Sequence, residues 1–488
     1  MQTHTTKLST AGQVLDCART ALPFASILGQ AFVSIPLGPE VQQVVPVRSS
    51  RFQAWLADNY YRQFATPPLD SALRGAVRQL EAAAWFNDGA RPVVARRIAA
   101  RGASVVLDLY NESGQVVEIT AAGWRTTSSL GFCFANARNA RPIPNPAESA
   151  RHPSAAIQQF RALLNLGQAD HWAAVLAWIL AALRPFGPYP ILILQGPASS
   201  GKSTLARLLR GLLDPNIVPF QPMPRSEREL LHLAHSHWVL AFDHVRRLPL
   251  TLSDALVRLS SGAVLAMRET SGDLDPMHVF LQRPVILTTP ADEHAVAWTS
   301  RSAVAARSIR IELPPIPAAL LRPQQELLAE FESAHPFILA ALCDAIGAAL
   351  ARPATEPFPA ARRFAEQTSW IESAASVLGA SSRQILQAIG MQDPLLDAIQ
   401  NLLADSGHWT GTPTALLAAL PGIANSASTL TRRLHALDPV GFTIEYGRAG
   451  RKGERKITLA KTDGSVHTMP SASYPQSIQP VEYKTARI

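Results

Sequence analysis

Short apolar runs alternate with helical segments in the middle of the chain. The apolar runs span residues 191–194, 238–242, 285–289 and 309–313, and the clearest helical segments between them are 202–212 and 252–259. Strands that alternate with helices predict an α/β layer built on a sheet. Apolar residues at helical spacing also fill 155–164, 171–183 and 324–350, so we expect further helices beside this layer.

Two mixed regions flank the α/β layer. Before it, residues 51–64 and 69–86 have helical spacing, whereas 105–109 and 116–120 predict a β-hairpin around a turn at 111–114. Residues 136–153 are rich in Asn, Pro, Arg and Ala and are expected to form a linker. After the layer, helical segments at 395–404, 412–420 and 428–437 precede strand-like runs at 442–446 and 456–459.

This organisation predicts an α/β protein in four parts. We expect an N-terminal α+β region with its linker at 1–150, a nucleotide-binding α/β region with a helical lid at 151–385, a small mixed module at 393–460, and a disordered polar tail at 461–488.

Composition narrows the class of protein. Hydrophobic residues make up 47% of the 488 residues and charged residues 17%, which is typical of a globular chain. The net charge of +8 favours polyanionic partners such as nucleic acid. The three cysteines form no CxxC pair, and a reducing cytoplasm suits them. The first residues lack the apolar run of a signal peptide, and the most apolar stretch, 173–194, is interrupted by Arg184 and several prolines, so we expect a soluble, cytoplasmic protein without a membrane partner.

The most specific motif is a glycine loop between a strand and a helix. The segment PILILQGPASSGKSTLARLL, residues 190–209, matches the pattern G-x-x-x-x-G-K-[ST] with the flanks that a P-loop needs. Its glycines let backbone amides turn towards phosphate oxygens, and the positive end of the following helix points at them. Lys202 is expected to reach the β- and γ-phosphates of ATP, and Ser203 to ligate Mg²⁺. The predicted nucleotide-binding residues are Gly196, Pro197, Ala198, Ser199, Ser200, Gly201, Lys202, Ser203 and Thr204.

A second acidic ligand for Mg²⁺ is expected at the end of another strand. The apolar run 238–242 brings Asp243 to such a position, which predicts Asp243 as the second metal ligand beside Ser203. An acidic residue normally follows to activate water, but His244 stands there; it either orients water or is an ordinary loop residue. Glu227, Glu229 and Glu269 are alternative bases. His232, His235 and His237 have a metal-like spacing, but no carboxylate or cysteine accompanies them, so we favour a helix end followed by a strand start.

With these motifs in view, residues 150–350 resemble the ATPase domain of superfamily 3 helicases. The likeness is closer to the primase-helicase-like ATPases of phages and integrative elements, related to the poxvirus-type primase-helicase. It covers WVLAFD, LSDALVRLSSGAVLAMRE, QRPVILTTP and AARSIRIELPPIP, with Gly262 and Arg268 matching a glycine and an arginine that follow the acidic strand. The resemblance implies an AAA+-like core and a ring, expected to be a homo-hexamer. It also implies that Arg307 is an arginine finger for a neighbouring subunit, whereas on sequence alone Arg307 could be a surface residue beside a strand.

The sequence departs from these helicases at three places. His244 replaces the usual acidic or amide residue, and Thr288 or Thr289 stands where a sensor asparagine is typical. The loop expected to contact DNA, residues 270–278, carries Asp273 and Asp275 and no lysine. The N-terminal region has no convincing carboxylate cluster for primer synthesis, so a separate primase or replication protein is the expected partner.

The C-terminal module predicts a winged helix that binds DNA. Its helices precede two strands around a basic loop, and a helix with a basic wing is a usual arrangement for groove insertion and backbone contact. The predicted DNA contacts are Arg432, Arg433, Arg448, Arg451, Lys452, Arg455 and Lys456. A solvated hairpin turn, or a winged helix that binds protein, is the alternative.

Two functions remain open at this point. The first is an ATP-driven DNA helicase or translocase in the replication of a phage or mobile element. The second is a DNA-binding P-loop ATPase that acts as a loader or switch without unwinding, which the altered acidic strand and the lysine-free loop favour. A small-molecule kinase is a weaker third, because it gives the basic wing no role.

Overall fold

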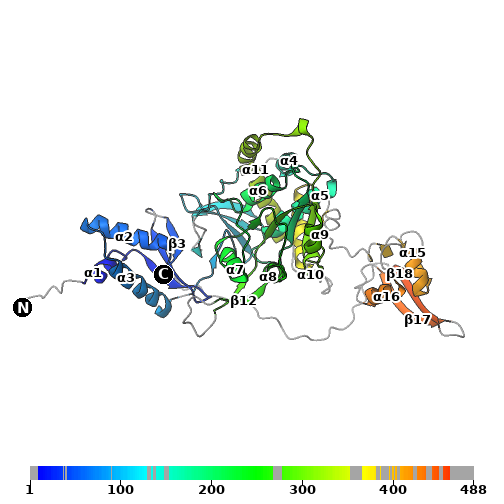
Figure 1. Cartoon of the computed structure of the whole chain (residues 1–488), viewed down its shortest axis with the longest axis horizontal. Helices are drawn as coiled ribbons and strands as arrows, with labels where there is room; N and C mark the ends of the chain where they lie inside the picture. Colours follow the sequence, from blue (N-terminus) through cyan, green and yellow to red (C-terminus); the bar gives the residue numbers. More distant parts are fainter. Residues whose placement is uncertain are drawn as a thin grey trace, which may run out of the picture. The chain divides into compact units, whose positions relative to one another are not determined.

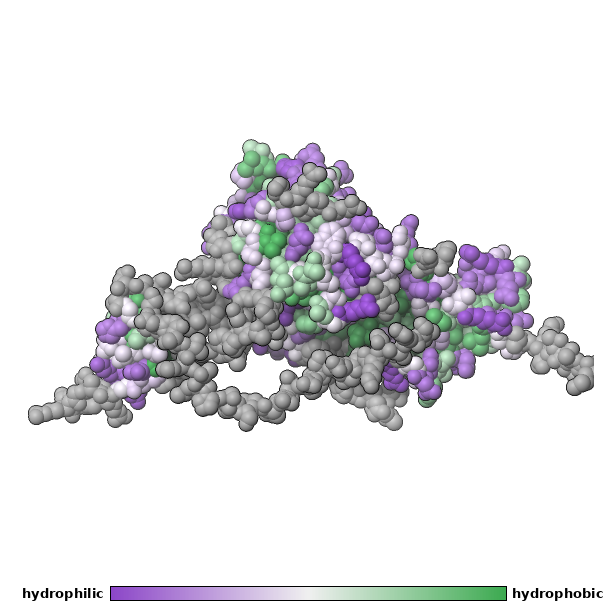
Figure 2. Space-filling view, turned by 180° about the vertical axis from the view of Figure 1, so that it is seen from behind, coloured by the Kyte–Doolittle hydropathy of each residue, from purple (hydrophilic) through white to green (hydrophobic). Residues whose placement is uncertain are grey.

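The chain divides into two compact units, Met1–Met391 and Gln392–Ile488. The computed structural model describes residues 9–36, 38, 41–89, 91–128, 133–135, 139–147, 153–267, 277–351, 365–380, 385, 395, 398–399, 402–403, 407–420, 426–435, 442–449 and 454–461. The predicted tail beyond residue 461 lies outside these ranges. On the face drawn in Figure 2, hydrophilic and hydrophobic side chains are interspersed over the surface.

The N-terminal part of the larger unit is an antiparallel sheet with helices packed on it (Figure 1, blue). The strands β1 (Leu22–Ala25), β2 (Ala31–Pro36) and β3 (Gln42–Pro46) pair in that order, and the helices are α1 (Thr10–Asp16), α2 (Ser50–Phe64) and α3 (Asp70–Phe86). Helix α2 begins where Ser49 Oγ accepts a hydrogen bond from the Phe52 backbone N–H. The two helices predicted here are confirmed, whereas the sequence did not predict the sheet, whose strands are short and do not alternate strictly.

A second antiparallel sheet belongs to the central core of the unit. Its order is β5 (Ile98–Arg101), β6 (Ser104–Asp108), β7 (Gln115–Thr120) and β8 (Gly123–Ser128), which confirms the predicted hairpin as β6–β7. The short strands β4 (Val94–Ala95) and β9 (Cys133–Phe134) pair separately. The sheet packs on helix α11 (Gln324–Ala351), where Trp124 Nε1 donates to Asp344 Oδ1 at 2.8 Å. Gly347 allows this close approach, since a Cβ there would lie 3.1 Å from the Thr120 carbonyl oxygen.

The central sheet is parallel and has the strand order β11-β14-β10-β15. These strands are β10 (Ile191–Gly196), β11 (Leu240–Phe242), β14 (Val285–Pro290) and β15 (Ser308–Glu312). Side chains of β10 are buried on both faces, as expected for a parallel strand between layers. The fold is therefore a mixed α/β structure with a parallel sheet and helices, and the four apolar runs of the sequence are its strands.

Helices pack on this sheet and fill the core between the sheets (Figure 1). They are α4 (Pro153–Ala162), α5 (Ala169–Ala182), α6 (Lys202–Leu213), α7 (Glu227–Ser236), α8 (Leu250–Ser261), α9 (Glu293–Thr299), α10 (Ser302–Ala305), α11 and α12 (Ala365–Val377), with a short 3₁₀ turn, η1, at Ala318–Leu320. A two-stranded hairpin, β12 (Ala263–Met267) with β13 (Met277–Leu281), follows α8. The predicted helices at 155–164, 171–183, 202–212, 252–259 and 324–350 all correspond to helices here.

Helix α11 is a core helix of this unit. By length and composition alone it is apolar enough to cross a membrane, but 67% of its most apolar window is buried inside the protein. Its buried side chains, among them Phe331, Ile338 and Leu342, join the same apolar cluster as α4, α5 and β10. Burial against the protein's own core explains its hydrophobic character.

The segment predicted as a linker is packed rather than free where the structure describes it. Residues 139–147 run along the core: Ile143 is buried, and the Arg141 backbone N–H donates to the Pro215 carbonyl at 2.9 Å. The N-terminal boundary predicted at residue 150 therefore does not separate two compact units, because strands β5–β7 share one apolar cluster with α4 and α5. Pro- and Asn-rich composition reflected the absence of regular backbone structure, not the absence of packing.

The smaller unit contains an antiparallel sheet of order β16-β18-β17 with helices beside it. The elements are β16 (His408–Gly411), α15 (Pro413–Ala419), α16 (Ala427–His435), β17 (Phe442–Ala449) and β18 (Glu454–Lys461). The two predicted strands and the two predicted helices at 412–420 and 428–437 are present, and β16 is an additional strand. Leu416, Leu430 and Leu459 are among the buried side chains that form a separate apolar cluster.

A buried ion pair links distant parts of the larger unit. Arg97, which is fully buried, donates from Nε to Asp214 Oδ1 at 2.9 Å, and Asp214 Oδ2 accepts the backbone N–H groups of Trp238 and Val239 at 3.0 and 3.2 Å. Burial raises the pKa of Asp214, but Arg97 and Arg210 outweigh it, so the net shift is downward and the carboxylate stays charged. The pair thus fixes the start of β11 against the segment before β5.

Asp214→Asn is predicted to destabilise the larger unit. The change leaves the Arg97 guanidinium buried without its counter-ion, and removing one partner of a buried pair costs about 3–5 kcal/mol. Chemical denaturation should therefore show a much lower free energy of unfolding. Asp58→Asn is the matched control, because Asp58 forms an exposed ion pair with Arg62 at 2.8 Å, and its loss costs under about 1 kcal/mol. Equal effects of the two changes would contradict the assigned role of Asp214.

Candidate functional site

The glycine loop joins the buried end of β10 to the start of α6. Gly196 is required by close packing, because a Cβ there would lie 2.6 Å from the Leu313 carbonyl oxygen. Gly201 has φ +80° and precedes the first residue of α6, and Ser199 also has a positive φ, +58°. This backbone favours glycine at residue 201. Pro197, Ala198 and Ser199 are exposed, Ser200 is buried and Thr204 is half-buried in the first turn of α6.

The segment after β15 is hydrogen-bonded to the glycine loop. The Ile316 backbone N–H donates to the Ser199 carbonyl at 3.1 Å. Asn165 Nδ2, just after α4, donates to the Ser200 carbonyl at 3.0 Å and to the Pro314 carbonyl at 2.8 Å. One amide group thus ties together three separate stretches of chain. Sequence reasoning did not single out Asn165, since no local pattern connects it to residues 35 and 149 positions away.

The Lys202 ammonium is hydrogen-bonded to the glycine loop itself. Its Nζ donates to the carbonyl oxygens of Gly196 at 2.8 Å and Pro197 at 2.6 Å, and to Ser200 Oγ at 3.3 Å. Partial burial lowers the pKa of Lys202, and the negative charge of Asp243 partly offsets this. The lysine is therefore a positive charge positioned within the loop, near the carboxylate of the neighbouring strand.

The predicted metal ligands Ser203 and Asp243 are in direct contact. Ser203 Oγ, at the start of α6, donates to Asp243 Oδ1 at 2.8 Å. Asp243 follows the last residue of β11, and Thr288 Oγ1, on β14, donates to the same carboxylate oxygen. Three oxygen-bearing side chains from three elements thus meet beside Lys202. Hydroxyl and carboxylate oxygens are ligands that Mg²⁺ accepts.

The structure separates the two threonines that the sequence could not separate. Thr288 faces Asp243, whereas Thr289 is fully buried and its Oγ1 donates to the Val245 carbonyl at 2.8 Å. His244 has φ +59°, its side chain is exposed, and its backbone N–H donates to Thr288 Oγ1 at 2.8 Å. The turn after β11 is therefore held by Thr288 through both Asp243 and His244. Whether the His244 imidazole orients water stays a prediction.

The alternative bases on α7 have structural partners. Glu227 forms an ion pair with Arg258 at 2.7 Å, and Glu229 accepts the Arg225 backbone N–H at 2.7 Å at the start of the helix. Both contacts anchor α7, so they offer no support for a catalytic role. Glu269 and Arg268 lie outside the described residues.

The histidines before β11 are the end of a helix and the start of a strand, as favoured from the sequence. His235 contacts Gln30 Oε1 through Nε2 at 2.6 Å, whereas His237 Nδ1 lies 3.3 Å from a guanidinium nitrogen of Arg210. Burial, with nearby arginines, lowers the pKa of His235 to about 3 and that of His237 to about 4. The two rings therefore have separate polar partners in different elements, and within the described residues no group of three metal-ligating side chains forms.

Arg307 and the glycine loop lie at opposite ends of paired parallel strands. Ile191, the first residue of β10, pairs with Ser308, whereas the loop follows Gly196 at the other end of β10. Arg307 itself is half-buried and donates from a guanidinium nitrogen to the Ala303 carbonyl at 3.2 Å. It therefore does not join Lys202, Asp243 and Thr288 within one chain.

The hairpin β12–β13 frames the loop that was expected to contact DNA. Its last described pair is Met267 with Met277. The acidic residues Asp273 and Asp275 lie outside the described residues. Gly262, where α8 ends, has φ +87° and leads directly into β12.

Two of the predicted DNA-contacting residues line a cavity on the smaller unit. Arg455 and Lys456 on β18 are exposed, and with Tyr446 on β17 and Thr431 on α16 they border a cavity of about 480 Å³. Tyr446 is 44% exposed, so an aromatic ring is accessible beside two cations. The side chains of Arg432, Arg433 and Arg448, and the whole of Arg451 and Lys452, lie outside what the structure describes.

Comparison with protein families gives one match. Residues 157–390 match the family described as "Actinomycete integrative conjugative element replication protein". The match covers slightly less than half of the chain and includes the glycine loop, Asp243, Thr288 and Arg307. This region is thus similar to replication proteins of mobile elements. No curated protein matches the sequence.

Comparison with solved structures gives loose likenesses. One is "The A form apo structure of NrS-1 C terminal region-CTR", with 11% identity, a TM-score of 0.35 and coverage of 91% of this chain and 98% of that chain. Another is "The X-ray structure of JCV Helicase", with 19% identity, a TM-score of 0.23 and coverage of 48% of this chain and 75% of that chain. Scores this low do not establish a shared fold.

Proposed function

We propose that this protein is an ATP-driven DNA helicase or translocase that serves the replication of a mobile element. In this proposal the α/β core is an AAA+-like P-loop ATPase, and the smaller unit is a winged helix that holds DNA. The observation that carries it is the convergence of Lys202, Ser203, Asp243 and Thr288 at the ends of β10, β11 and β14.

The geometry supports binding of ATP with Mg²⁺ at this convergence. Ser203 Oγ and Asp243 Oδ1, 2.8 Å apart, are the oxygens that would hold the ion. Bound Mg²⁺ would neutralise negative charge on the phosphates. The Lys202 ammonium, now bonded to loop carbonyls, would exchange these partners for phosphate oxygens, and the N-terminus of α6 adds a favourable dipole.

Hydrolysis needs a group that orients water beside the terminal phosphate. Thr288 is our candidate, because its hydroxyl already contacts Asp243 and the His244 backbone. The exposed His244 imidazole follows Asp243 directly and is a second candidate. His244, rather than a carboxylate, follows Asp243 in this chain. We therefore assign the polarisation of water to the Thr288 hydroxyl, which contacts the turn at Asp243 and His244.

Arg307 fits a role in trans better than one in its own chain. Its position at the far end of β10 and β15 keeps it from the glycine loop of the same subunit. In a ring of identical subunits, expected to be a hexamer, a heterologous interface would bring it to the phosphates of a neighbour. Hydrolysis would then depend on assembly.

The cavity of the smaller unit that Arg455 and Lys456 line supports the DNA-binding part of the proposal. Arg455 and Lys456 would contact phosphates, and each such contact releases counter-ions and makes affinity depend on salt. The similarity of residues 157–390 to replication proteins of integrative elements supports the biological setting. We also propose that a separate primase or replication protein makes primers.

A loader or switch that hydrolyses ATP without unwinding DNA is the second candidate. The observation that favours it is the composition of residues 270–278, which carry two aspartates and no lysine or arginine to grip a strand. Both candidates share the ATP site and differ only in what hydrolysis does to DNA.

Lys202→Ala is predicted to slow ATP hydrolysis strongly, and with a strand-displacement assay it separates the two candidates. Loss of the ammonium should lower the hydrolysis rate by about 100-fold or more, because it stabilises charge on the transferred phosphate. Strand displacement on forked DNA is then measured for both proteins. Unwinding that requires Lys202 supports the helicase, and DNA-stimulated hydrolysis without displacement supports the loader. Arg322→Ala, at an exposed ion pair with Glu330, is the control and should hydrolyse ATP normally. An ATP hydrolysis rate of Lys202→Ala equal to that of the wild-type protein would contradict both candidates.

Thr288→Val and Thr289→Val form a matched pair of nearly isosteric changes. Thr288→Val removes the hydroxyl that contacts Asp243 and His244, so kcat should fall by about 10-fold or more. Thr289→Val removes a hydrogen bond to the Val245 carbonyl, so it should cost about 1 kcal/mol of stability and leave kcat nearly unchanged. Steady-state hydrolysis and thermal denaturation check both. If Thr289→Val impaired kcat as much as Thr288→Val, the assignment of Thr288 would be wrong.

Mixing two inactive variants tests the role of Arg307. Arg307→Ala and Asp243→Asn should each hydrolyse ATP poorly alone. In a mixed ring, an Arg307→Ala subunit keeps Asp243 and can receive the arginine of an Asp243→Asn neighbour, so about a quarter of the interfaces in an equal mixture would be competent. Hydrolysis should therefore reappear on mixing. Absence of recovery, with light scattering showing that mixed oligomers form, would contradict a trans arginine.

A further inference from the structure

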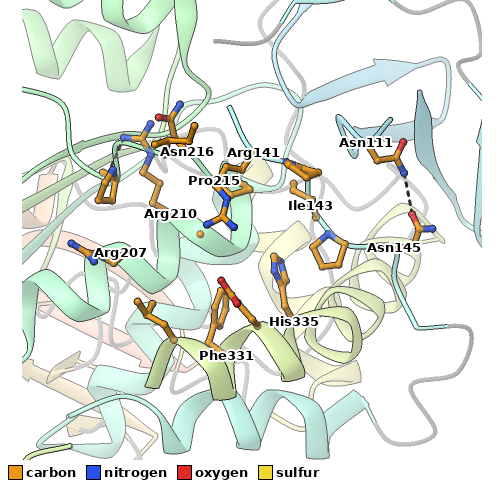
Figure 3. Close-up of a pocket in the computed structure, with 17 residues that line it drawn as sticks. Asn111, Arg141, Ile143, Asn145, Arg207, Arg210, Pro215, Asn216, Phe331 and His335 are labelled. Atoms are coloured by element: carbon orange, nitrogen blue, oxygen red, sulfur yellow. Dashed lines mark hydrogen bonds between the residues drawn. The ribbon is translucent and has the colours of Figure 1, made fainter. Parts of the chain in front are cut away.

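Aromatic side chains and cations line two cavities of the described part of the chain, and the rings differ in how far they are open to solvent. In the cavity between α6 and α11 (Figure 3), Phe331 stacks on His335 with ring centroids 5.0 Å apart, and each residue is only 5% exposed. The Arg207 guanidinium lies over the Phe220 ring, 5.9 Å from its centroid. These groups are engaged with one another. In the cavity of the smaller unit, by contrast, the ring of Tyr446 is accessible, since this residue is 44% exposed.

The pairing of β17 with β18 places Tyr446 where an apolar face ends. Tyr446 pairs with Ile457, which is 1% exposed and belongs to the apolar core of the smaller unit. Residues that pair directly in an antiparallel ladder lie on the same face of the sheet. Arg455 lies two positions from Ile457 along β18, so it is on this face as well, but it is exposed. The face therefore passes from the core, through the Tyr446 ring, to a cation.

The other walls of this cavity come from two helices. Pro413 begins α15 and Thr431 lies on α16, and with the paired strands they border a volume of about 480 Å³, within the range of small-molecule sites. The Thr431 hydroxyl donates to the Ala427 carbonyl at 2.8 Å, so its hydrogen is used inside the helix. Arg455 and Lys456 supply positive charge, and no carboxylate is among the described lining residues.

The sequence around the ring is basic. Residues 445–456 read EYGRAGRKGERK, in which arginine and lysine outnumber glutamate. A surface with this balance attracts a phosphate backbone, because each cation that contacts a phosphate releases counter-ions. Cations alone, however, do not distinguish a duplex from an unpaired strand. The exposed aromatic ring beside them supplies that distinction.

A flat aromatic ring stacks on a nucleobase only where the base is unpaired or ends a duplex. Inside a duplex each base is stacked between its neighbours, and only its edges face the grooves. Stacking on an aromatic side chain strengthens the binding of a single strand by about 5- to 150-fold per base and depends little on sequence. An exposed ring beside cations therefore suits an unpaired strand better than a groove.

We propose that the cavity of the smaller unit binds an unpaired DNA strand, with a base stacked on the Tyr446 ring and a neighbouring phosphate held by Arg455. This inference rests on the proposed function, in which the smaller unit holds DNA, and it names the form of DNA that is held. A guanidinium suits the phosphate because its planar donors match the phosphate oxygens. Insertion of α16 into a duplex groove would give the exposed ring no role.

A strand with bases and a strand without bases separate stacking from charge. The full-length protein is titrated with an oligothymidylate of about 12 nucleotides and with an abasic strand of the same length and charge, and fluorescence anisotropy gives both affinities. Tyr446→Ala should weaken binding of the thymidylate by about tenfold and leave binding of the abasic strand unchanged. Tyr446→Phe keeps the ring and should bind both strands as the wild-type protein does. Tyr61→Ala is the matched control, because Tyr61 is 56% exposed on α2 of the larger unit, and it should alter neither affinity.

Photo-crosslinking of the wild-type protein locates the contact without any substitution. A strand that carries iodouracil, whose base attaches on irradiation to a ring stacked on it, should crosslink to Tyr446, and mass spectrometry of the peptides identifies the site. Relaxed circular duplex DNA, which has no ends, should bind Tyr446→Ala as well as it binds the wild-type protein. Thermal denaturation checks that each variant is folded.

Three results would overturn the inference. They are thymidylate binding by folded Tyr446→Ala that equals that of the wild-type protein, an equal loss of affinity for the thymidylate and the abasic strand, and crosslinks that occur only at other residues. Each of these leaves DNA binding intact, so it contradicts stacking and not the proposed function. Absence of binding to every DNA by the wild-type protein would contradict the proposed function together with this inference.

Discussion

The register of three parallel strands is the constraint on which the candidate site depends. Phe242 on β11 pairs with Leu287 on β14, and Leu194 on β10 pairs with Thr288. Asp243 and Thr288 therefore follow matched positions and emerge at the same edge as the glycine loop. A shift of one residue in either pairing would turn Thr288 to the other face of the sheet. Hydrogen bonds from Ser203 and Thr288 to Asp243 are consequences of this register rather than independent features.

Buried charge supports that register from outside the site. Asp214 accepts the backbone N–H groups at the start of β11 while it neutralises Arg97, and Arg283 donates to the carbonyls of Ala234 and His237 before the same strand. Burial lowers the pKa of Arg283 to about 10, which still leaves it charged at neutral pH. The strand that delivers Asp243 is short, only Leu240–Phe242, so these side-chain contacts replace the backbone pairs that a longer strand would have. Buried polar groups thus position the end of β11, where Asp243 is proposed to hold Mg²⁺.

The features of the fold and of the site that depend on local pattern or on a motif were predictable from the sequence. Apolar runs identified the four central strands, and the glycine motif identified the turn in which Gly196 and Gly201 are sterically required. Asp243 was located because a carboxylate at the end of an apolar run reaches the edge of a sheet. Thr288 could not be separated from Thr289, since only the strand pairing decides which hydroxyl faces Asp243.

Contacts between distant stretches were beyond the sequence. Asn165 bonds to residues 35 and 149 positions away, and Arg97 pairs with Asp214 across 117 positions. The composition of residues 139–147 suggested a linker, yet the backbone bond of Arg141 and the burial of Ile143 attach this segment to the core. Such contacts depend on the three-dimensional path of the chain, and no local pattern in the sequence marks them.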